Sequence, residues 1–426
     1  MPRSDAHPSP AGPWTEDDAE RYLLGLELFG MRFGLDRMRR LLTTLGSPQE
    51  RFGSIHVVGT NGKSSTVRMT AAILERHGLR SGAYLSPHLV SFTERIRIGE
   101  RDLEPAAFAD AVRAAARAAA KVDRTLGEGD HVTQFEALTA AALAELARRE
   151  VDVAVVEAGL GGRYDATNVL PSRVAVLTNV GLEHTRWLGP TVTDISREKL
   201  AVLRPATTLV IGAGLHPDAE REARDAAQRA GAQLIVAPAD AGVALGARGE
   251  FQRRNFALAR TAAEAYLGRL DDDAVRAAAA ATLVPGRFQE LDADPPTVLD
   301  GAHNPGGIAA LAGSLPAYLD NRPLTAVVAI LDDKDAAAML RELLPHAARL
   351  VVTRSANPRS LSPATLESLA SQLGATDVVA VAEPHAALER ARELARADGG
   401  VVLATGSIYL VADLVRPPGA RRGATL

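Results

Sequence analysis

A lysine and two serines follow a glycine-rich turn in the stretch IHVVGTNGKSSTVRM, residues 55–69. Four β-favouring residues precede the turn, and a helical pattern that we predict to start near Thr66 follows it. Backbone N–H groups of such a turn bind phosphate oxygens, a lysine neutralises the outer phosphates, and a hydroxyl binds Mg²⁺. The spacing departs from G-x-x-x-x-G-K-[ST], because Val57 stands at the first glycine position. The alternative is a plain turn, but the order of features favours a phosphate loop built from Gly59, Thr60, Asn61, Gly62, Lys63, Ser64 and Ser65.

Three further segments carry oxygen or imidazole donors directly after predicted strands. The run VDVAVVE ends on Glu157, LSPHL carries Ser86 and His88, and GLEHTRWLG carries His184. Ligands of open α/β sheets bind at the carboxyl ends of the strands. A carboxylate beside a phosphate loop is expected to bind Mg²⁺. The alternatives are a glutamate that caps its own loop and histidines with structural roles.

A parallel sheet must bring these side chains together. Apolar runs at 55–58, 151–157, 174–178 and 207–211 alternate with helical patterns such as 135–149, which predicts βαβ units. A second series follows the proline-rich segment 285–296, with strands predicted at 297–300, 325–331, 349–353, 377–381 and 400–404. We predict an α/β protein with a flexible tail over 1–14, a P-loop-type ATPase domain with a mainly parallel sheet over 15–284, and a smaller Rossmann-like α/β domain over 285–426.

Composition limits the class of protein. The absence of cysteine excludes disulfides, thiolate zinc sites and a cysteine nucleophile, and the net charge of −4 argues against a general nucleic-acid binder. No apolar run has the length of a membrane span, and the first residues lack a signal core. We therefore expect a cytoplasmic protein that binds neither nucleic acid nor membranes.

Several motifs together resemble the folylpolyglutamate synthase/dihydrofolate synthase family of the Mur ligase superfamily. They are VVGTNGKSS, LSPHL with ERI, VVEAGLGGRYDATNV, LEHTRWLG, FQRRN and DGAHNP, in the family's order between about Leu35 and the segment 405–415. The resemblance implies an ATP-dependent ligase of Mur ligase architecture, acting as a monomer on small molecules. ATP would phosphorylate a substrate carboxylate, and the amine of L-glutamate would attack the acyl phosphate. The substrate would be dihydropteroate, a folate that carries glutamate, or both.

The resemblance also implies roles for individual residues. ATP would be bound by the phosphate loop, with Asn255, Arg287 and Asp300 as further contacts. Two Mg²⁺ sites would use Ser86, Glu157, His184, Ser65 and Lys199. Lys199 matches a lysine that the family carries as a carbamate, whereas its sequence context alone favours a solvated helix surface. Lys63, Lys199 and His303 would be catalytic, although His303 could instead fix the turn before Asn304. The pterin substrate would contact Gly34, Leu35, Asp36, Arg37, Phe135, Glu136, Tyr164, Asp165 and Ala166.

Two departures and two alternatives accompany this prediction. The family usually has glycine at Ser64 and aspartate at Glu183, so either Ser64 or Ser65 is the hydroxyl that meets Mg²⁺. A ligase of muramyl nucleotides is disfavoured because only residues 1–58 precede the loop, too few for a UDP-binding domain. An ATP-binding module without turnover is disfavoured by the joint presence of Lys63, Glu157, His184 and Lys199.

Overall fold

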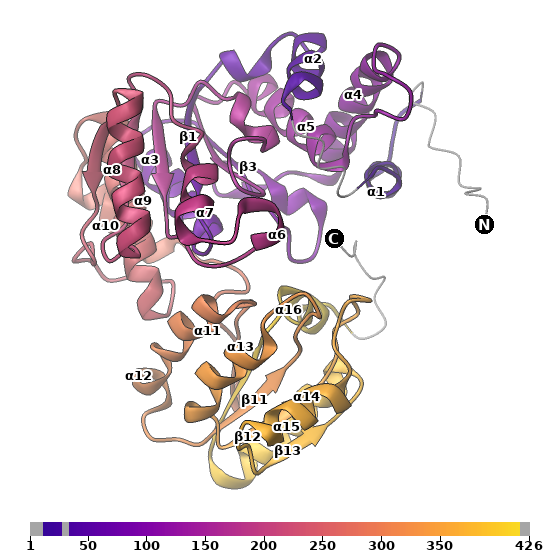
Figure 1. The fold of residues 1–426 in the computed structure, drawn as a ribbon, viewed down its shortest axis with the longest axis vertical. Coiled ribbons are helices and arrows are strands. Elements are labelled where there is room, and N and C mark those ends of the chain that lie inside the picture. Colours follow the sequence, from indigo (N-terminus) through magenta and orange to yellow (C-terminus); the bar gives the residue numbers. More distant parts are fainter. Residues whose placement is uncertain (1–11, 28–33, 418–426) are drawn as a thin grey trace. The chain divides into compact units, whose positions relative to one another are not determined.

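The computed structural model describes residues 12–27 and 34–417, which form two compact units (Figure 1). One unit contains the chain up to residue 244 together with 254–282, and the other contains 245–253 together with the chain from 283 onward. The assignment of functional domains with a boundary at 284/285 stays a prediction. Of the tail predicted over 1–14, residues 1–11 lie outside the described part, whereas Trp14 is buried against Tyr22.

The first unit is built on an eight-stranded sheet in the order β4-β3-β2-β5-β1-β6-β7-β8. The strands are β1 (Gly53–Val58), β2 (Ser81–Tyr84), β3 (Ile96–Ile98), β4 (Arg101–Asp102), β5 (Val153–Glu157), β6 (Val174–Leu177), β7 (Thr208–Ile211) and β8 (Gln233–Val236). Pairing is parallel from β2 to β8 and antiparallel between β2, β3 and β4. The four strands predicted in this part are confirmed as β1, β5, β6 and β7, while the antiparallel edge was not predicted.

Helices cover this sheet, since its central strands are apolar on both faces. They are α1 (Glu16–Gly25), α2 (Asp36–Thr44), α3 (Lys63–Arg76), α4 (Pro105–Asp123), α5 (Gln134–Arg148), α6 (Thr185–Leu188), α7 (Val192–Leu200), α8 (Pro217–Ala230), α9 (Glu250–Leu267) and α10 (Asp272–Ala281). One apolar cluster joins α7 and α8 to β6 and β7 through buried side chains that include Ile195, Ala223, Leu177 and Leu209. The prediction that the helix after the phosphate loop starts near Thr66 was wrong: α3 begins at Lys63, because Gly62 supplies the left-handed conformation that ends the turn.

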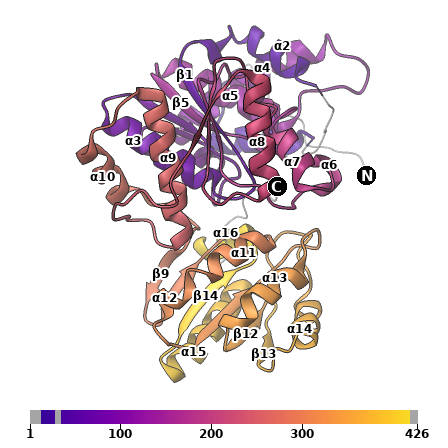
Figure 2. The ribbon, with the colours of Figure 1, turned by 60° about the vertical axis from the view of Figure 1, so that its left-hand side comes forward.

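The second unit has a six-stranded sheet in the order β13-β12-β11-β14-β10-β9, in which β9 alone is antiparallel to its neighbour. Its strands are β9 (Gln289–Ala293), β10 (Pro296–Leu299), β11 (Leu324–Val328), β12 (Arg349–Val352), β13 (Val378–Ala380) and β14 (Val401–Thr405). Its helices are α11 (Pro305–Ala312), α12 (Leu315–Leu319), α13 (Ala336–Leu343), α14 (Pro363–Gln372), α15 (Pro384–Asp398) and α16 (Ile408–Val415) (Figure 2).

Side-chain alternation divides the core of the second unit between the two faces of its sheet. Ala326 and Val328 belong to a cluster with α11, α13 and α14, so the alternate residue Val327 points to the opposite face, where α15 packs on β11 and β14. The predicted α/β fold, with one large, mainly parallel sheet and a second sheet in the C-terminal part, is thus confirmed.

Candidate active site at the carboxyl ends of the first sheet

The predicted phosphate loop connects β1 to α3 and is tied to the segment that follows the neighbouring strand β6. Thr60 N donates to Asn179 O at 2.9 Å, and Asn61 N donates to Asn179 Oδ1 at 2.8 Å. Thr178 Oγ1 donates to Asn61 O at 2.7 Å. These hydrogen bonds fix the shape of the loop at the carboxyl end of β1, where ligands of open α/β sheets bind.

Gly62 shows why a glycine is needed in this loop. Its φ is +84°, which a side chain disfavours, and a Cβ at this position would overlap Asn255 Oδ1. Asn255 comes from α9 and is buried. The predicted ATP contact Asn255 therefore does lie beside the predicted phosphate loop.

The lysine of the loop is turned back onto its own turn. Lys63 Nζ donates to Thr60 O at 3.1 Å. Lys63, Ser64 and Ser65 occupy the first turn of α3, whose N-cap residue is Gly62 and therefore supplies no side-chain cap. Helix N-terminal N–H groups lack partners within the helix, so this turn presents donors and a positive dipole end.

Glu157 ends β5, beside β1, and both of its carboxylate oxygens accept hydrogen bonds. Ser64 Oγ donates to Oε1 at 3.0 Å, and Ser86 N donates to Oε2 at 3.2 Å. Glu157 is buried, and so is Ser65. Of the two candidate hydroxyls, the one in contact with this carboxylate is that of Ser64.

Lys199 is buried rather than solvated, which differs from the expectation from its sequence context alone. Its Nζ donates to Gly59 O at 2.8 Å, so α7 contacts the phosphate loop directly. Burial, and secondly the positive charge of Lys63, lowers the pKa of Lys199 to about 7. An amine with this pKa is substantially uncharged at neutral pH, as an amine must be to react with CO₂.

His184 and Glu183 belong to the segment between β6 and α6. His184 has a φ of +52°, and its Nε2 lies 3.9 Å from Glu183 Oε1. The His184 side chain is largely exposed, whereas that of Glu183 is mostly buried. The charge of Glu183 raises the pKa of Lys199 against the larger effect of burial, so this segment faces the same site as Lys199.

The segment around Ser86 is held by the ERI motif that follows it. Glu94 accepts hydrogen bonds from the backbone N–H groups of Leu89, Val90 and Ser91. Arg95 Nε donates to His88 Nδ1 at 2.9 Å. His88, a candidate donor from the sequence, thus accepts from Arg95 at Nδ1, a contact that the sequence did not indicate and that gives His88 a structural role.

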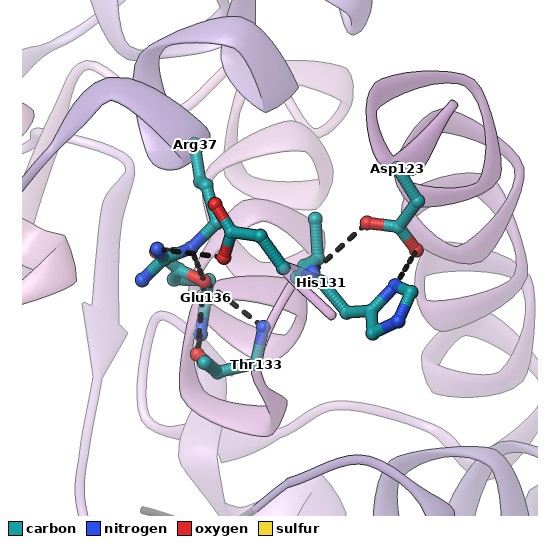
Figure 3. Close-up of polar contacts among 7 residues, drawn as sticks. Arg37, Asp123, His131, Thr133 and Glu136 are labelled. Atoms are coloured by element: carbon teal, nitrogen blue, oxygen red, sulfur yellow. Dashed lines mark hydrogen bonds and ion pairs between the residues drawn. The ribbon is translucent and has the colours of Figure 1, made fainter. Parts of the chain in front are cut away.

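Two of the residues predicted to contact the pterin substrate form an ion pair with each other (Figure 3). Arg37 Nε lies 3.2 and 3.1 Å from the carboxylate oxygens of Glu136, and Arg37 Nη1 lies 3.2 Å from Asp130 Oδ1. Glu136 also accepts from Thr133 N and Oγ1, which caps α5. The pair thus joins the start of α2, with Gly34, Leu35 and Asp36 directly before Arg37, to the start of α5.

Of the remaining predicted pterin contacts, Phe135 lies on α5, and Tyr164, Asp165 and Ala166 lie on the loop after Glu157. Phe135 packs against Gly159, and Tyr164 is 48% exposed, whereas Asp165 and Ala166 are buried. Asp165 Oδ2 accepts from Leu160 N at 2.8 Å and Oδ1 accepts from Thr167 N at 3.0 Å. Burial raises the pKa of Asp165, partly offset by these hydrogen bonds. Its carboxylate therefore shapes its own loop, a role that the sequence did not indicate.

Arg287, Asp300 and His303 lie together in the second unit. Asp300 accepts from Phe288 N at 2.9 Å and from Ala302 N at 2.8 Å, and burial raises its pKa although Arg287 opposes this. His303 Nδ1 donates to Gly301 O at 2.9 Å, in the turn before α11. The ATP-binding and catalytic roles of these three residues stay predictions.

Two further properties of the described residues concern metals and membranes. Across residues 12–27 and 34–417, no group of three or more His, Cys, Asp or Glu side chains is arranged to hold a metal ion. None of the helices in these ranges is both long and apolar enough to cross a membrane.

Comparison with known proteins gives one consistent result. The Mur ligase middle domain family matches residues 57–256, and the Mur ligase glutamate ligase domain family matches residues 286–408. A dihydrofolate synthase/folylpolyglutamate synthase of Mycobacterium tuberculosis is 36% identical over 82% of this chain and 80% of its own length. The Escherichia coli protein of the same description is 32% identical over 97% of each chain.

Solved structures agree with these sequence matches. Mycobacterium tuberculosis folylpolyglutamate synthase complexed with ADP has a TM-score of 0.88 at 33% identity, covering 96% of this chain and 100% of that chain. Escherichia coli FolC in complex with DHPP and ADP has a TM-score of 0.84 at 29% identity, covering 96% of this chain and 98% of that chain.

Proposed function

The chain belongs to the folylpolyglutamate synthase/dihydrofolate synthase family of Mur ligases, and from this premise we propose that it joins L-glutamate to dihydropteroate, to the glutamate tail of folates, or to both. ATP phosphorylates the substrate carboxylate and leaves as ADP. The glutamate amine then attacks the acyl carbon, phosphate is expelled, and an amide bond forms. Phosphorylation is needed because an unmodified carboxylate would have to expel oxide.

The observation that carries the proposal is that two lysines and a buried carboxylate all contact the same glycine-rich loop or the first turn of the helix after it. Lys199 and Lys63 donate to the consecutive carbonyl oxygens of Gly59 and Thr60, and Ser64 donates to Glu157. We propose that the loop binds the ATP phosphates, that Asn255 contacts the nucleotide, and that Lys63 neutralises charge on the transferred phosphoryl group.

The oxygen donors Glu157, Ser86 and Ser64 suit Mg²⁺, which prefers oxygen ligands and is usually held by one or two carboxylates together with substrate phosphates. We propose that Glu157, Ser86 and His184 hold it, with Ser64 rather than Ser65 as the loop hydroxyl, since Ser64 contacts Glu157. When bound, Mg²⁺ stabilises negative charge on the phosphoryl oxygens. Lys199 would join the metal ligands as a carbamate, and its buried, readily deprotonated amine supports this; intact-protein mass measured in bicarbonate tests it.

The test supplies ATP, Mg²⁺, labelled L-glutamate and either dihydropteroate or a reduced folate. Label transfer to one or both substrates, with one ADP formed per amide, is the expected result. Transfer to neither substrate, combined with ATP hydrolysis induced by a muramyl nucleotide, would identify the chain as a different Mur-type ligase.

A further inference from the structure

A buried histidine on β1 lies behind the loop that carries the predicted pterin contacts. His56 is 1% exposed, and its Nε2 lies 2.8 Å from Thr167 Oγ1. Thr167 Oγ1 in turn donates to Asp165 Oδ1. A hydroxyl has one proton, and that of Thr167 is donated to Asp165. The Thr167 oxygen must therefore be the acceptor in its hydrogen bond with His56. This order places a proton on Nε2 of His56, which donates to Thr167.

The chain of hydrogen bonds ends on the backbone of the loop. Asp165 accepts from Leu160 N and from Thr167 N, so one carboxylate holds the two ends of the segment 160–167 together. The middle of the segment contacts the end of α7: Arg163 N donates to Glu198 O at 2.9 Å. The loop is therefore fixed on one side by α7, next to Lys199, and on the other by the network that starts at His56.

We propose that His56 is a positioning residue for substrate binding: through Thr167 and Asp165 it holds the loop 159–166 in the shape that receives the pterin part of the substrate. This inference rests on the proposed function, because the pterin contacts of Tyr164, Asp165 and Ala166 come from the family resemblance. His56 lies behind Thr167 and acts through it. A buried donor and acceptor that lose their partners are costly, so the loop would relax if His56 could not donate.

The decisive variants come in pairs at His56 and at Thr167, and in each pair one variant keeps the hydrogen-bonding group and the other removes it. In His56→Gln the side-chain amide can still donate to Thr167, whereas His56→Leu fills the space without a donor. Thr167→Val removes the hydroxyl at nearly constant volume, and Thr167→Ser keeps it. Ser54→Ala is the matched control, since Ser54 is buried on the same face of β1 and its Oγ donates to Ser172 Oγ at 3.2 Å, outside the loop 159–166.

Two measurements on the full-length protein separate the possibilities. Hydrogen–deuterium exchange reports the loop directly: His56→Leu and Thr167→Val should exchange at residues 159–166 about tenfold faster than the wild type, with no change for Ser54→Ala. Equilibrium titration should show dihydropteroate or folate binding weakened by about tenfold and ADP binding within about twofold, because loop misplacement acts on the ligand that the loop contacts. Gln and Ser should restore both properties.

The two failures can be told apart. If the wild type binds neither pterin ligand, the proposed function is wrong, while the exchange experiment still tests the network. The positioning role of His56 is refuted if the wild type binds a pterin ligand and His56→Leu binds it equally well. It is also refuted if the affinities of His56→Leu for the pterin ligand and for ADP change no more than those of the control Ser54→Ala.

Discussion

Acid should destabilise the first unit through His56, and the size of the effect follows from its burial. Burial, with the charge of Arg204 as a smaller cause, lowers the pKa of His56 to about 3 from an ordinary value of 6.5. Below pH 6.5 the unfolded chain binds a proton at His56 that the folded chain does not, so stability falls as pH falls from 6.5 toward 3. Each pH unit in that window costs about 1.4 kcal/mol, so the loss at pH 5 is about 2 kcal/mol.

The perturbation that isolates this effect is His56→Gln, which keeps a donor to Thr167 but cannot titrate. Wild type and variant are unfolded by urea at pH 7.5 and at pH 5.0. Tryptophan fluorescence is the signal, because both tryptophans of the chain, Trp14 and Trp187, belong to the first unit. Other groups titrate equally in the two proteins and cancel in the difference.

The wild type should lose about 2 kcal/mol more unfolding free energy than His56→Gln between the two pH values. At pH 7.5 the histidine is neutral in both folded and unfolded chains and contributes no pH dependence. If the difference between the two proteins is the same at pH 5.0 as at pH 7.5, His56 is not held neutral in the folded protein and the reasoning fails.

Three substitutions test the phosphate loop and its neighbours. Lys63→Ala should lower the turnover number by about 10³ with an unchanged melting temperature, because it removes phosphate neutralisation and little packing; near-normal label transfer would show that the site is misplaced. Glu157→Gln should move the Mg²⁺ midpoint of ATP binding at least about tenfold, and an unchanged titration would contradict its assignment. Gly62→Ala should abolish nucleotide binding through overlap with Asn255, whereas Gly78→Ala should not, since Gly78 has a similar φ of +81° but open space around its Cβ; equal effects would mean that backbone strain alone matters.

The strands were predictable because their apolar runs are long and bounded by turns. The runs at 55–58 and 174–178 became the adjacent strands β1 and β6, and Glu157 does end β5. The parallel order of the central strands then follows from the alternation with helices. The antiparallel strands β3 (Ile96–Ile98) and β9 (Gln289–Ala293) are short, and an alternation such as Ile-Arg-Ile over so few residues does not distinguish a strand from a loop.

The candidate site was predictable as residue types but not as contacts. The local sequence around Lys199 is typical of a helix surface, because the residue's buried partner, the Gly59 carbonyl, lies 140 positions earlier in the chain. The pairing of Arg37 with Glu136 likewise spans 99 positions. His56 was read only as part of a strand, because neither its burial nor its bond to Thr167 leaves a local pattern. The individual roles of the site residues, the monomeric state and the cytoplasmic location stay predictions.

If Lys63 binds the nucleotide as proposed, its hydrogen bond to Thr60 has a consequence for nucleotide affinity. Its ammonium group donates to the Thr60 carbonyl, so in the proposed role a triphosphate would compete with the protein's own backbone for this cation. Giving up one such hydrogen bond typically forfeits about 1 kcal/mol, or roughly a fivefold loss of affinity. In return, the same hydrogen bond would hold the Lys63 side chain close to the proposed phosphate site, so that less side-chain entropy is lost when phosphate binds.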